Sequence, residues 1–259
     1  MDTYNFTVHL IKAAGRLLEE KKKETFAVSF KGGNPKDIVT SLDLEINDFI
    51  TSHINEAYPE HSIYSEEAAV VAGNGYQWAI DPIDGSASFA RSIPQYSISI
   101  GLLKDGIPVL GAVLDPVAGE LFSFKKGEGA WLNGEPISPS KHTELRSCFI
   151  LLAAGRRPEQ VDWAGESLKR LLRNANKTKN FGSSAMWLCY LAAGRVDGVI
   201  AGTFSAKDIA AAVGILTEVG GVLTGADGRS IAMSSAVQRV YAANNESIGT
   251  QLRELLESA

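Results

Sequence analysis

The chain has 259 residues, 45% of them hydrophobic, and 25 Lys and Arg against 30 Asp and Glu give a formal net charge of -5. This length and composition suit one large α/β domain, or two smaller ones that share a core. The acidic balance and the lack of a basic stripe argue against nucleic acid as the main partner. An anionic substrate would need a positive group in its site, which a bound metal ion would supply.

The N-terminus and the hydropathy pattern predict neither export nor a membrane span. No basic region precedes an apolar run, and no stretch approaches the ~18 consecutive apolar residues that a membrane span needs. The two cysteines, Cys148 and Cys189, lie far apart in apolar settings, which predicts buried, reduced thiols rather than a disulfide. We therefore expect a soluble, cytoplasmic protein.

The first part of the chain predicts two amphipathic helices. Apolar residues with helical spacing predict a helix over residues 4–22, which Thr3 could cap. We expect the lysines at 21–23 to be its solvated end rather than a binding patch. Residues 31–36 are typical of a loop, and a second amphipathic helix is expected to begin near Leu42.

Short strands follow the second helix. Two apolar runs, at 62–64 and 77–80, each lead directly into acidic residues. Beyond them, three runs with alternating apolar residues are separated by turns, at 96–103, 109–114 and 121–124. This pattern predicts an antiparallel meander.

The second half of the chain predicts alternating strands and helices. Strands are expected at 149–152, 177–181 and 196–200, and helices at 163–172, 183–194 and 207–219. The fold class is therefore α+β or layered α/β, with an antiparallel sheet first and a mixed sheet second. We expect an N-terminal half, 1–145, that carries most of the metal ligands, and a C-terminal half, 146–259, joined in one compact unit.

Two acidic residues, Asp81 and Asp84, follow directly after an apolar strand. Pro82 forces an extended-to-turn geometry between them, and Gly85 can adopt dihedral angles that other residues avoid. Two carboxylates held together are unfavourable unless a cation neutralises them, and oxygen ligands select a hard ion such as Mg²⁺. A surface turn is the plain alternative, because Asp-Pro and Asp-Gly are common in turns.

Further acids lie at the ends of other predicted elements. Glu66 and Glu67 follow the strand at 62–64, Asp43 lies at the start of the second helix, and Asp208 lies in the first turn of the last predicted helix. Each alone would be a helix cap or a solvated acid, but together they indicate a shared site. The histidines lack metal-ligand spacing and are interpreted as bystanders: His9, His53, His61 and His142.

The segment 78–89 resembles the signature of the inositol monophosphatase family, a Trp before Asp-Pro-Ile-Asp-Gly-Thr and a Phe shortly after, with Ser86 in place of Thr. Residues 37–43 resemble the family's Asp-Leu-Val-Thr-x-x-Asp segment, and residues 64–67 resemble its Gly-Glu-Glu segment. Residues 207–221 resemble its second signature, Trp-Asp-x-Ala-Ala with a downstream Gly-Gly. These matches occur in the family's order and cover most of the chain.

The resemblance implies a layered α-β-α-β-α sandwich of the inositol monophosphatase and sugar phosphatase type, Mg²⁺ as cofactor, and commonly a homodimer. The implied metal ligands are Glu66, Asp81, the backbone carbonyl of Ile83, Asp84 and Asp208. Asp43 and Ser86 are the implied pair that orients and deprotonates the attacking water. The implied substrate-binding residues are Asp84, Gly85 and Ser86 for the phosphate, with Gly182, Ser183, Ser184 and Ala185 in the loop that follows Phe181. Helix capping by Ser183 is a plain reading of that loop, and the two roles are compatible.

Three departures from the family pattern bear on the substrate. Ser65 replaces a glycine, Lys207 replaces the signature tryptophan, and Ala201 stands where relatives that hydrolyse inositol phosphates carry a glutamate. The resemblance therefore implies Mg²⁺-dependent hydrolysis of a small phosphate monoester, such as inositol monophosphate or a related sugar or polyol phosphate. The alternatives are fructose 1,6-bisphosphate, histidinol phosphate or 3′-phosphoadenosine 5′-phosphate as substrate, or a binding or regulatory role.

Overall fold

The computed structural model describes residues 2–34, 38–65, 74–155, 157–180, 182–231, 233 and 237–258. Several residues of the predicted motifs lie outside this part of the chain: Asp37, Glu66, Glu67 and Phe181. The side chain of Lys207 is also outside it.

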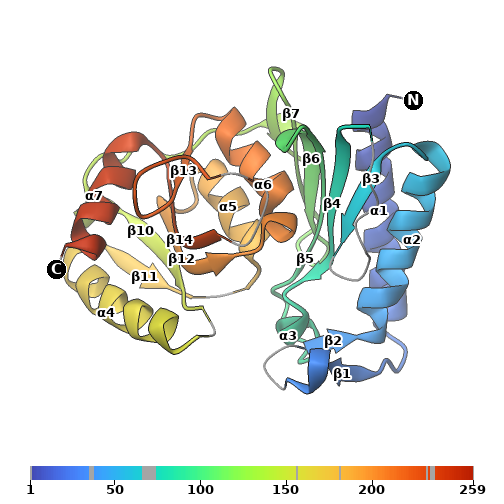
Figure 1. The fold of residues 1–259 in the computed structure, drawn as a ribbon, viewed down its shortest axis with the longest axis horizontal. Coiled ribbons are helices and arrows are strands. Elements are labelled where there is room, and N and C mark those ends of the chain that lie inside the picture. Colours follow the sequence, from blue (N-terminus) through green and yellow to red (C-terminus); the bar gives the residue numbers. More distant parts are fainter. Residues whose placement is uncertain are drawn as a thin grey trace.

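The described residues form helices and strands that stack in layers (Figure 1). The helices are α1 (Thr3–Lys21), α2 (Ser41–Ala57), α3 (Ser86–Phe89), α4 (Pro158–Asn174), α5 (Ser184–Ala192), α6 (Ala206–Glu218) and α7 (Glu246–Glu257), with short 3₁₀ turns at Lys31–Gly33 and Leu145–Ser147. The strands are β1 (Val28–Phe30), β2 (Ile38–Thr40), β3 (Ser62–Ser65), β4 (Tyr76–Asp84), β5 (Ser97–Lys104), β6 (Ile107–Asp115), β7 (Glu120–Lys125), β8 (Gly129–Leu132), β9 (Glu135–Pro136), β10 (Phe149–Ala153), β11 (Lys177–Lys179), β12 (Gly198–Phe204), β13 (Val222–Thr224) and β14 (Val237–Ala243).

Five layers alternate across the molecule. Helices α1 and α2 cover one face of a seven-stranded sheet, α5 and α6 lie between that sheet and a five-stranded sheet, and α4 and α7 cover the outer face of the five-stranded sheet (Figure 1). Three apolar clusters fill the spaces between neighbouring layers. The predicted α-β-α-β-α sandwich is therefore confirmed.

The seven-stranded sheet has the order β3-β4-β5-β6-β7-β8-β9. Every neighbouring pair is antiparallel except β3 and β4, which run parallel. This confirms the predicted meander and extends it by two short strands that the sequence pattern did not indicate. Because β4 carries the Asp-Pro-Ile-Asp segment, these acids lie at the C-terminal end of β4, beside the start of β5.

The five-stranded sheet has the order β11-β10-β12-β14-β13. Strands β11, β10 and β12 run parallel, whereas β14 is antiparallel to both of its neighbours. The predicted mixed sheet is confirmed, although β13, β14 and α7 were not predicted from the sequence. The predicted strand at 177–181 is shorter than expected and ends at Lys179.

Helix α6 approaches the seven-stranded sheet closely because two glycines face it. A Cβ atom on Gly101 would lie 3.0 Å from the backbone nitrogen of Ala211, and one on Gly111 would lie 2.9 Å from the Ala211 Cβ. Larger residues at either position would push the helix away from the sheet. These contacts position the helix that carries Asp208 in its first turn.

Both ends of helix α1 differ from the prediction, in the residue that caps its start and in the contacts of the lysines at its end. Asp2, not Thr3, is the N-cap, because its Oδ1 accepts a hydrogen bond from the backbone N–H of Asn5 at 2.8 Å. At the other end, Lys22 is only partly exposed and its ammonium group binds Glu19 and Tyr96. The expectation that residues 21–23 form a purely solvated end is therefore wrong for Lys22. No helix in the described part of the chain is long and apolar enough to cross a membrane.

Candidate active site

The Asp-Pro-Ile-Asp segment forms the last residues of β4 and is almost completely buried. Asp81 is 4% exposed and Asp84 is 8% exposed. The pairing register with β5 shifts between these two aspartates, where Pro82 has no N–H to donate to the sheet. Asp81 Oδ1 accepts a hydrogen bond from the Ile83 backbone N–H at 3.1 Å. The segment therefore forms an irregular end of β4 that carries both carboxylates.

Gly85 connects this strand to α3 with a backbone conformation that suits glycine. Its φ angle is +102°, and a Cβ atom there would lie 2.8 Å from the Gln95 carbonyl oxygen. A side chain would be unfavourable for both reasons. The predicted special role of Gly85 in the turn agrees with this geometry.

Asp43 and Ser86 lie in direct contact, although 43 positions separate them in the chain. The Ser86 Oγ lies 2.8 Å from Asp43 Oδ1 and 2.9 Å from the Ile83 carbonyl oxygen. The other oxygen of Asp43 accepts hydrogen bonds from the backbone N–H and the hydroxyl of Thr40, at 2.8 and 2.5 Å. Thr40 and Asp43 form the capping box of α2, which fixes the orientation of the carboxylate.

Asp84 joins the two halves of the chain. Its Oδ2 accepts hydrogen bonds from the Ser183 hydroxyl at 2.5 Å and from the Ala185 backbone N–H at 2.7 Å. Ser183 is also the N-cap of α5, because its Oγ accepts from the Met186 backbone N–H at 3.3 Å. The capping reading of Ser183 is therefore confirmed, and the same hydroxyl contacts the predicted metal ligand. The Ser97 Oγ lies 2.7 Å from the Ser183 Oγ.

The remaining predicted site residues, Glu66 apart, lie at the starts of two helices. Asp208 lies in the first turn of α6, and Gly182 and Ser184 flank the Ser183 cap of α5. In the part of the chain that the structure describes, no three His, Cys, Asp or Glu side chains form a group that could hold a metal ion. Glu66 lies outside that part.

The donor chemistry of the described residues fits a hard cation. Asp81, Asp84 and Asp208 offer carboxylate oxygens, and Ile83 offers a carbonyl oxygen, which is the ligand type that Mg²⁺ prefers. Two of these carboxylates, Asp81 and Asp84, are buried within the last four residues of one strand. A cation is the usual way in which proteins compensate such a concentration of negative charge.

The histidines and cysteines take part in local structure. Each histidine ring contacts a neighbouring group through Nδ1, with partners Asn5, Phe49, Trp78 and Asp197 for His9, His53, His61 and His142. Cys148 and Cys189 are buried and free, as predicted. Burial raises the pKa of Cys148 to about 12 and raises that of Cys189 well above its usual value, so both thiols stay protonated at neutral pH.

Two residues of the site were missed by the sequence analysis. Thr40 had a readable signal, since a Thr three residues before an Asp at a helix start is a capping-box pattern. Ser97 had none, because it is one of several alternating residues on β5. Ala201 has only a methyl side chain, which offers no polar group to a substrate. It is fully buried in β12, where it pairs with Ala153 and Val240.

Comparison with known proteins identifies the class to which this fold and site belong. The model of the inositol monophosphatase family matches residues 2–259, and the chain belongs to that family of phosphomonoesterases. The chain is 33% identical to the fructose-1,6-bisphosphatase/inositol-1-monophosphatase of Thermotoga maritima, over 88% of this chain and 87% of that protein. It is 30% identical to human inositol monophosphatase 1, over 98% of this chain and 93% of the relative. Among solved structures, extragenic suppressor protein suhB from Bartonella henselae superposes with a TM-score of 0.91 at 28% identity, covering 98% of each chain.

Proposed function

We propose that this protein is a Mg²⁺-dependent phosphatase that hydrolyses a small phosphate monoester with water as the nucleophile. The observation that carries the proposal is the Asp43–Ser86 pair, with 2.8 Å between the carboxylate and hydroxyl oxygens, at the end of the strand that carries Asp81 and Asp84. Family membership supports the reaction class. The described histidines and cysteines, which already have structural partners or lie buried, leave no evident protein nucleophile.

The Ser86 hydroxyl can orient a water molecule and pass on its proton. A hydroxyl has one hydrogen to donate and lone pairs to accept another. When Ser86 donates to Asp43 Oδ1, its oxygen remains able to accept a hydrogen bond from an attacking water. Asp43 is suited to accept the proton that Ser86 passes on, because hydrogen bonds from Thr40 hold its second oxygen in place. The pair therefore positions the water and withdraws its proton toward a fixed carboxylate.

The acidic cluster would hold the metal. Asp81, Asp84, Asp208, Glu66 and the Ile83 carbonyl would supply oxygen ligands to Mg²⁺, and Ser183 and Ala185 would keep the Asp84 carboxylate in place. When bound, such ions lower the pKa of a coordinated water and stabilise the charge that develops on the leaving oxygen.

We propose a sugar or polyol phosphate, including inositol monophosphate, as the substrate. The small residues at the start of α5 support this choice, since Gly182, Ser183, Ser184 and Ala185 carry no bulky side chain and this segment binds Asp84. Because position 201 is a buried alanine, hydroxyl recognition would depend on other groups than in relatives with a glutamate there. The preferred substrate is therefore identified by comparing turnover among phosphate esters. We also expect a homodimer, which sedimentation velocity would test.

The test is phosphate release from a panel of esters, with and without Mg²⁺. The panel contains inositol 1-phosphate, fructose 1,6-bisphosphate, histidinol phosphate and 3′-phosphoadenosine 5′-phosphate. We expect Mg²⁺-dependent turnover that Ser86→Ala lowers by at least about 100-fold in kcat. Ser88→Ala, on the same short helix, is the matched control and should leave kcat near that of the unmodified protein. Thermal stabilisation by Mg²⁺ without turnover of any ester would instead favour a binding role.

A further inference from the structure

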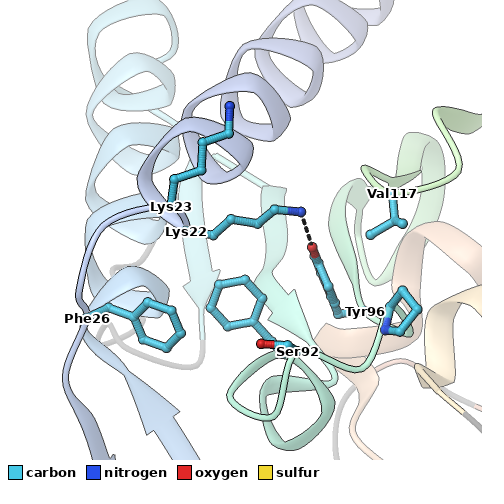
Figure 2. Close-up of a pocket in the computed structure, with 8 residues that line it drawn as sticks. Lys22, Lys23, Phe26, Ser92, Tyr96 and Val117 are labelled. Carbon is cyan, nitrogen blue, oxygen red and sulfur yellow. Dashed lines mark hydrogen bonds between the residues drawn. The ribbon is translucent and has the colours of Figure 1, made fainter.

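A cavity of about 230 Å³ lies between the end of α1, helix α3 and the turn after β6 (Figure 2). It is separate from the Asp43–Ser86 pair, since neither residue lines it. Its walls come from three segments that are distant in the sequence: Lys22, Lys23, Phe26, Phe89, Ser92, Pro94, Tyr96 and Val117.

Aromatic rings form much of the wall. Phe26 stacks on Phe89 with 5.2 Å between the ring centroids and 28° between the ring planes. Tyr96 meets the same Phe89 edge to face, at 5.0 Å and 82°. Phe89 and Tyr96 are almost completely buried, so their positions are set by the core. Fixed rings of this kind suit a flat apolar group.

Lys22 reaches across the cavity toward Tyr96 (Figure 2). Its Nζ lies 2.5 Å from Glu19 Oε2 and 3.1 Å from the Tyr96 hydroxyl, which itself donates to Glu19 Oε1 at 3.0 Å. An ammonium group has three N–H donors, so one remains for a ligand. The neighbouring Lys23 is exposed and, within the described residues, forms no ion pair. Both lysines line the cavity, and their positive charge favours an anionic ligand.

We propose that this cavity binds a small aromatic carboxylate, with its ring against Phe26 and Phe89 and its carboxylate on Lys22. The shape and the charge point to the same class, because the apolar wall and the free ammonium donor lie within one cavity. The cavity is smaller than the pockets of about 300–1,000 Å³ that bind drug-sized ligands, which suits a single ring with one acidic substituent.

Occupancy of the cavity would reach the proposed catalytic pair through α3. Phe89 is the last residue of this short helix and Ser86 is its first. Backbone hydrogen bonds from Phe89 to Gly85 at 3.0 Å and from Ala90 to Ser86 at 2.9 Å make the helix one rigid turn. A ligand that packs against Phe89 would therefore affect the orientation of the Ser86 hydroxyl toward Asp43. This second step, unlike the binding itself, rests on the proposed function.

The binding test uses 4-fluorobenzoate as the probe and ¹⁹F NMR of the full chain. We expect the unmodified protein to broaden and shift the probe resonance, and Lys22→Met to weaken binding by about tenfold or more. Lys141→Met, which removes an exposed lysine outside the cavity, is the matched control and should bind as the unmodified protein does. If Lys22→Met fails to fold, Val117→Trp provides the test instead. This variant keeps Lys22 but fills the cavity from its rim, so it should abolish binding.

Three results would overturn the proposal: no change in the probe resonance, binding by Lys22→Met and Val117→Trp as tight as binding by the unmodified protein, or displacement of the probe by inorganic phosphate. The last result would place the probe at the phosphate site. Loss of phosphatase activity in every assay would contradict the proposed function but would leave the NMR result intact. Where turnover is measurable, saturating probe should change kcat in the unmodified protein and in Lys141→Met, but not in Lys22→Met.

Discussion

Replacement of Ser183 by alanine tests whether the contact between the two halves of the chain is structurally important. The Ser183 hydroxyl has two functions in the structure, since it caps α5 through the Met186 N–H and donates to the buried carboxylate of Asp84. Alanine removes both interactions at once. It also leaves the Ser97 hydroxyl, which is fully buried, without this partner.

The size of the effect follows from these contacts. Loss of a serine N-cap costs about 1 kcal/mol, and loss of a hydrogen bond to a charged group costs about 1.5–3 kcal/mol. Because Ala185 still donates to Asp84, we expect the lower part of the combined range, about 3 kcal/mol. In a chain of this size, that corresponds to a decrease in Tm of about 6–12 °C.

The assay is thermal unfolding followed by circular dichroism, with kcat measured below the unfolding transition. Ser183→Thr keeps a hydroxyl that can cap and donate, so it should recover most of the lost stability. Ser184→Ala changes the next residue along, which has no side-chain bond to Asp84 among the described contacts, and serves as the control. A Tm for Ser183→Ala equal to that of Ser184→Ala would refute the reasoning.

Three further predictions concern the metal site, pH and packing. Asp84→Asn should lower kcat at least ~100-fold while the protein stays folded, and near-normal turnover would contradict its assignment as a metal ligand. Burial lowers the pKa of His61, opposed by a nearby glutamate, and Trp78 donates to its Nδ1, so the folded protein favours the neutral ring. Since the unfolded chain then binds more protons, the free energy of unfolding should fall as the pH decreases below 6.5, until the folded-state pKa is passed, and urea titrations of His61→Gln should lack this component. Gly214→Ala would place a Cβ 1.9 Å from Phe124 Cζ and should cost about 1–3 kcal/mol, whereas an unchanged urea midpoint would contradict this packing.

Strong hydrophobic periodicity made most element types predictable. Strand β14 escaped prediction for a physical reason: it lies between β12 and β13 and ends in Ala242 and Ala243, which are fully buried but have low intrinsic strand preference. Its Arg239 has a φ angle of +49°, which interrupts the regular strand. Burial on both faces of the sheet determines this strand, and a local pattern cannot show that.

The candidate site was predictable only in part. The order of residues around Asp81 and Asp84 pointed to a shared acidic site, and the family resemblance supplied Asp43 and Ser86 as a pair, which the structure places in contact. The bond from Ser183 to Asp84 joins residues 99 positions apart, and no spacing rule gives such a contact. The lysine run was misjudged because partners distant in sequence, above all Tyr96, decide whether a lysine is solvated.

The position of β14 has a consequence for synthesis of the protein. The ribosome makes β10, β11 and β12 well before Val237–Ala243, yet β14 is the neighbour that covers one side of β12. Until those last residues emerge, the nascent chain exposes an open strand edge that contains Val199 and Ile200. A premature stop codon anywhere before position 237 would make that exposure permanent. Such truncated products should aggregate or be degraded by proteases even when they retain every residue of the acidic cluster.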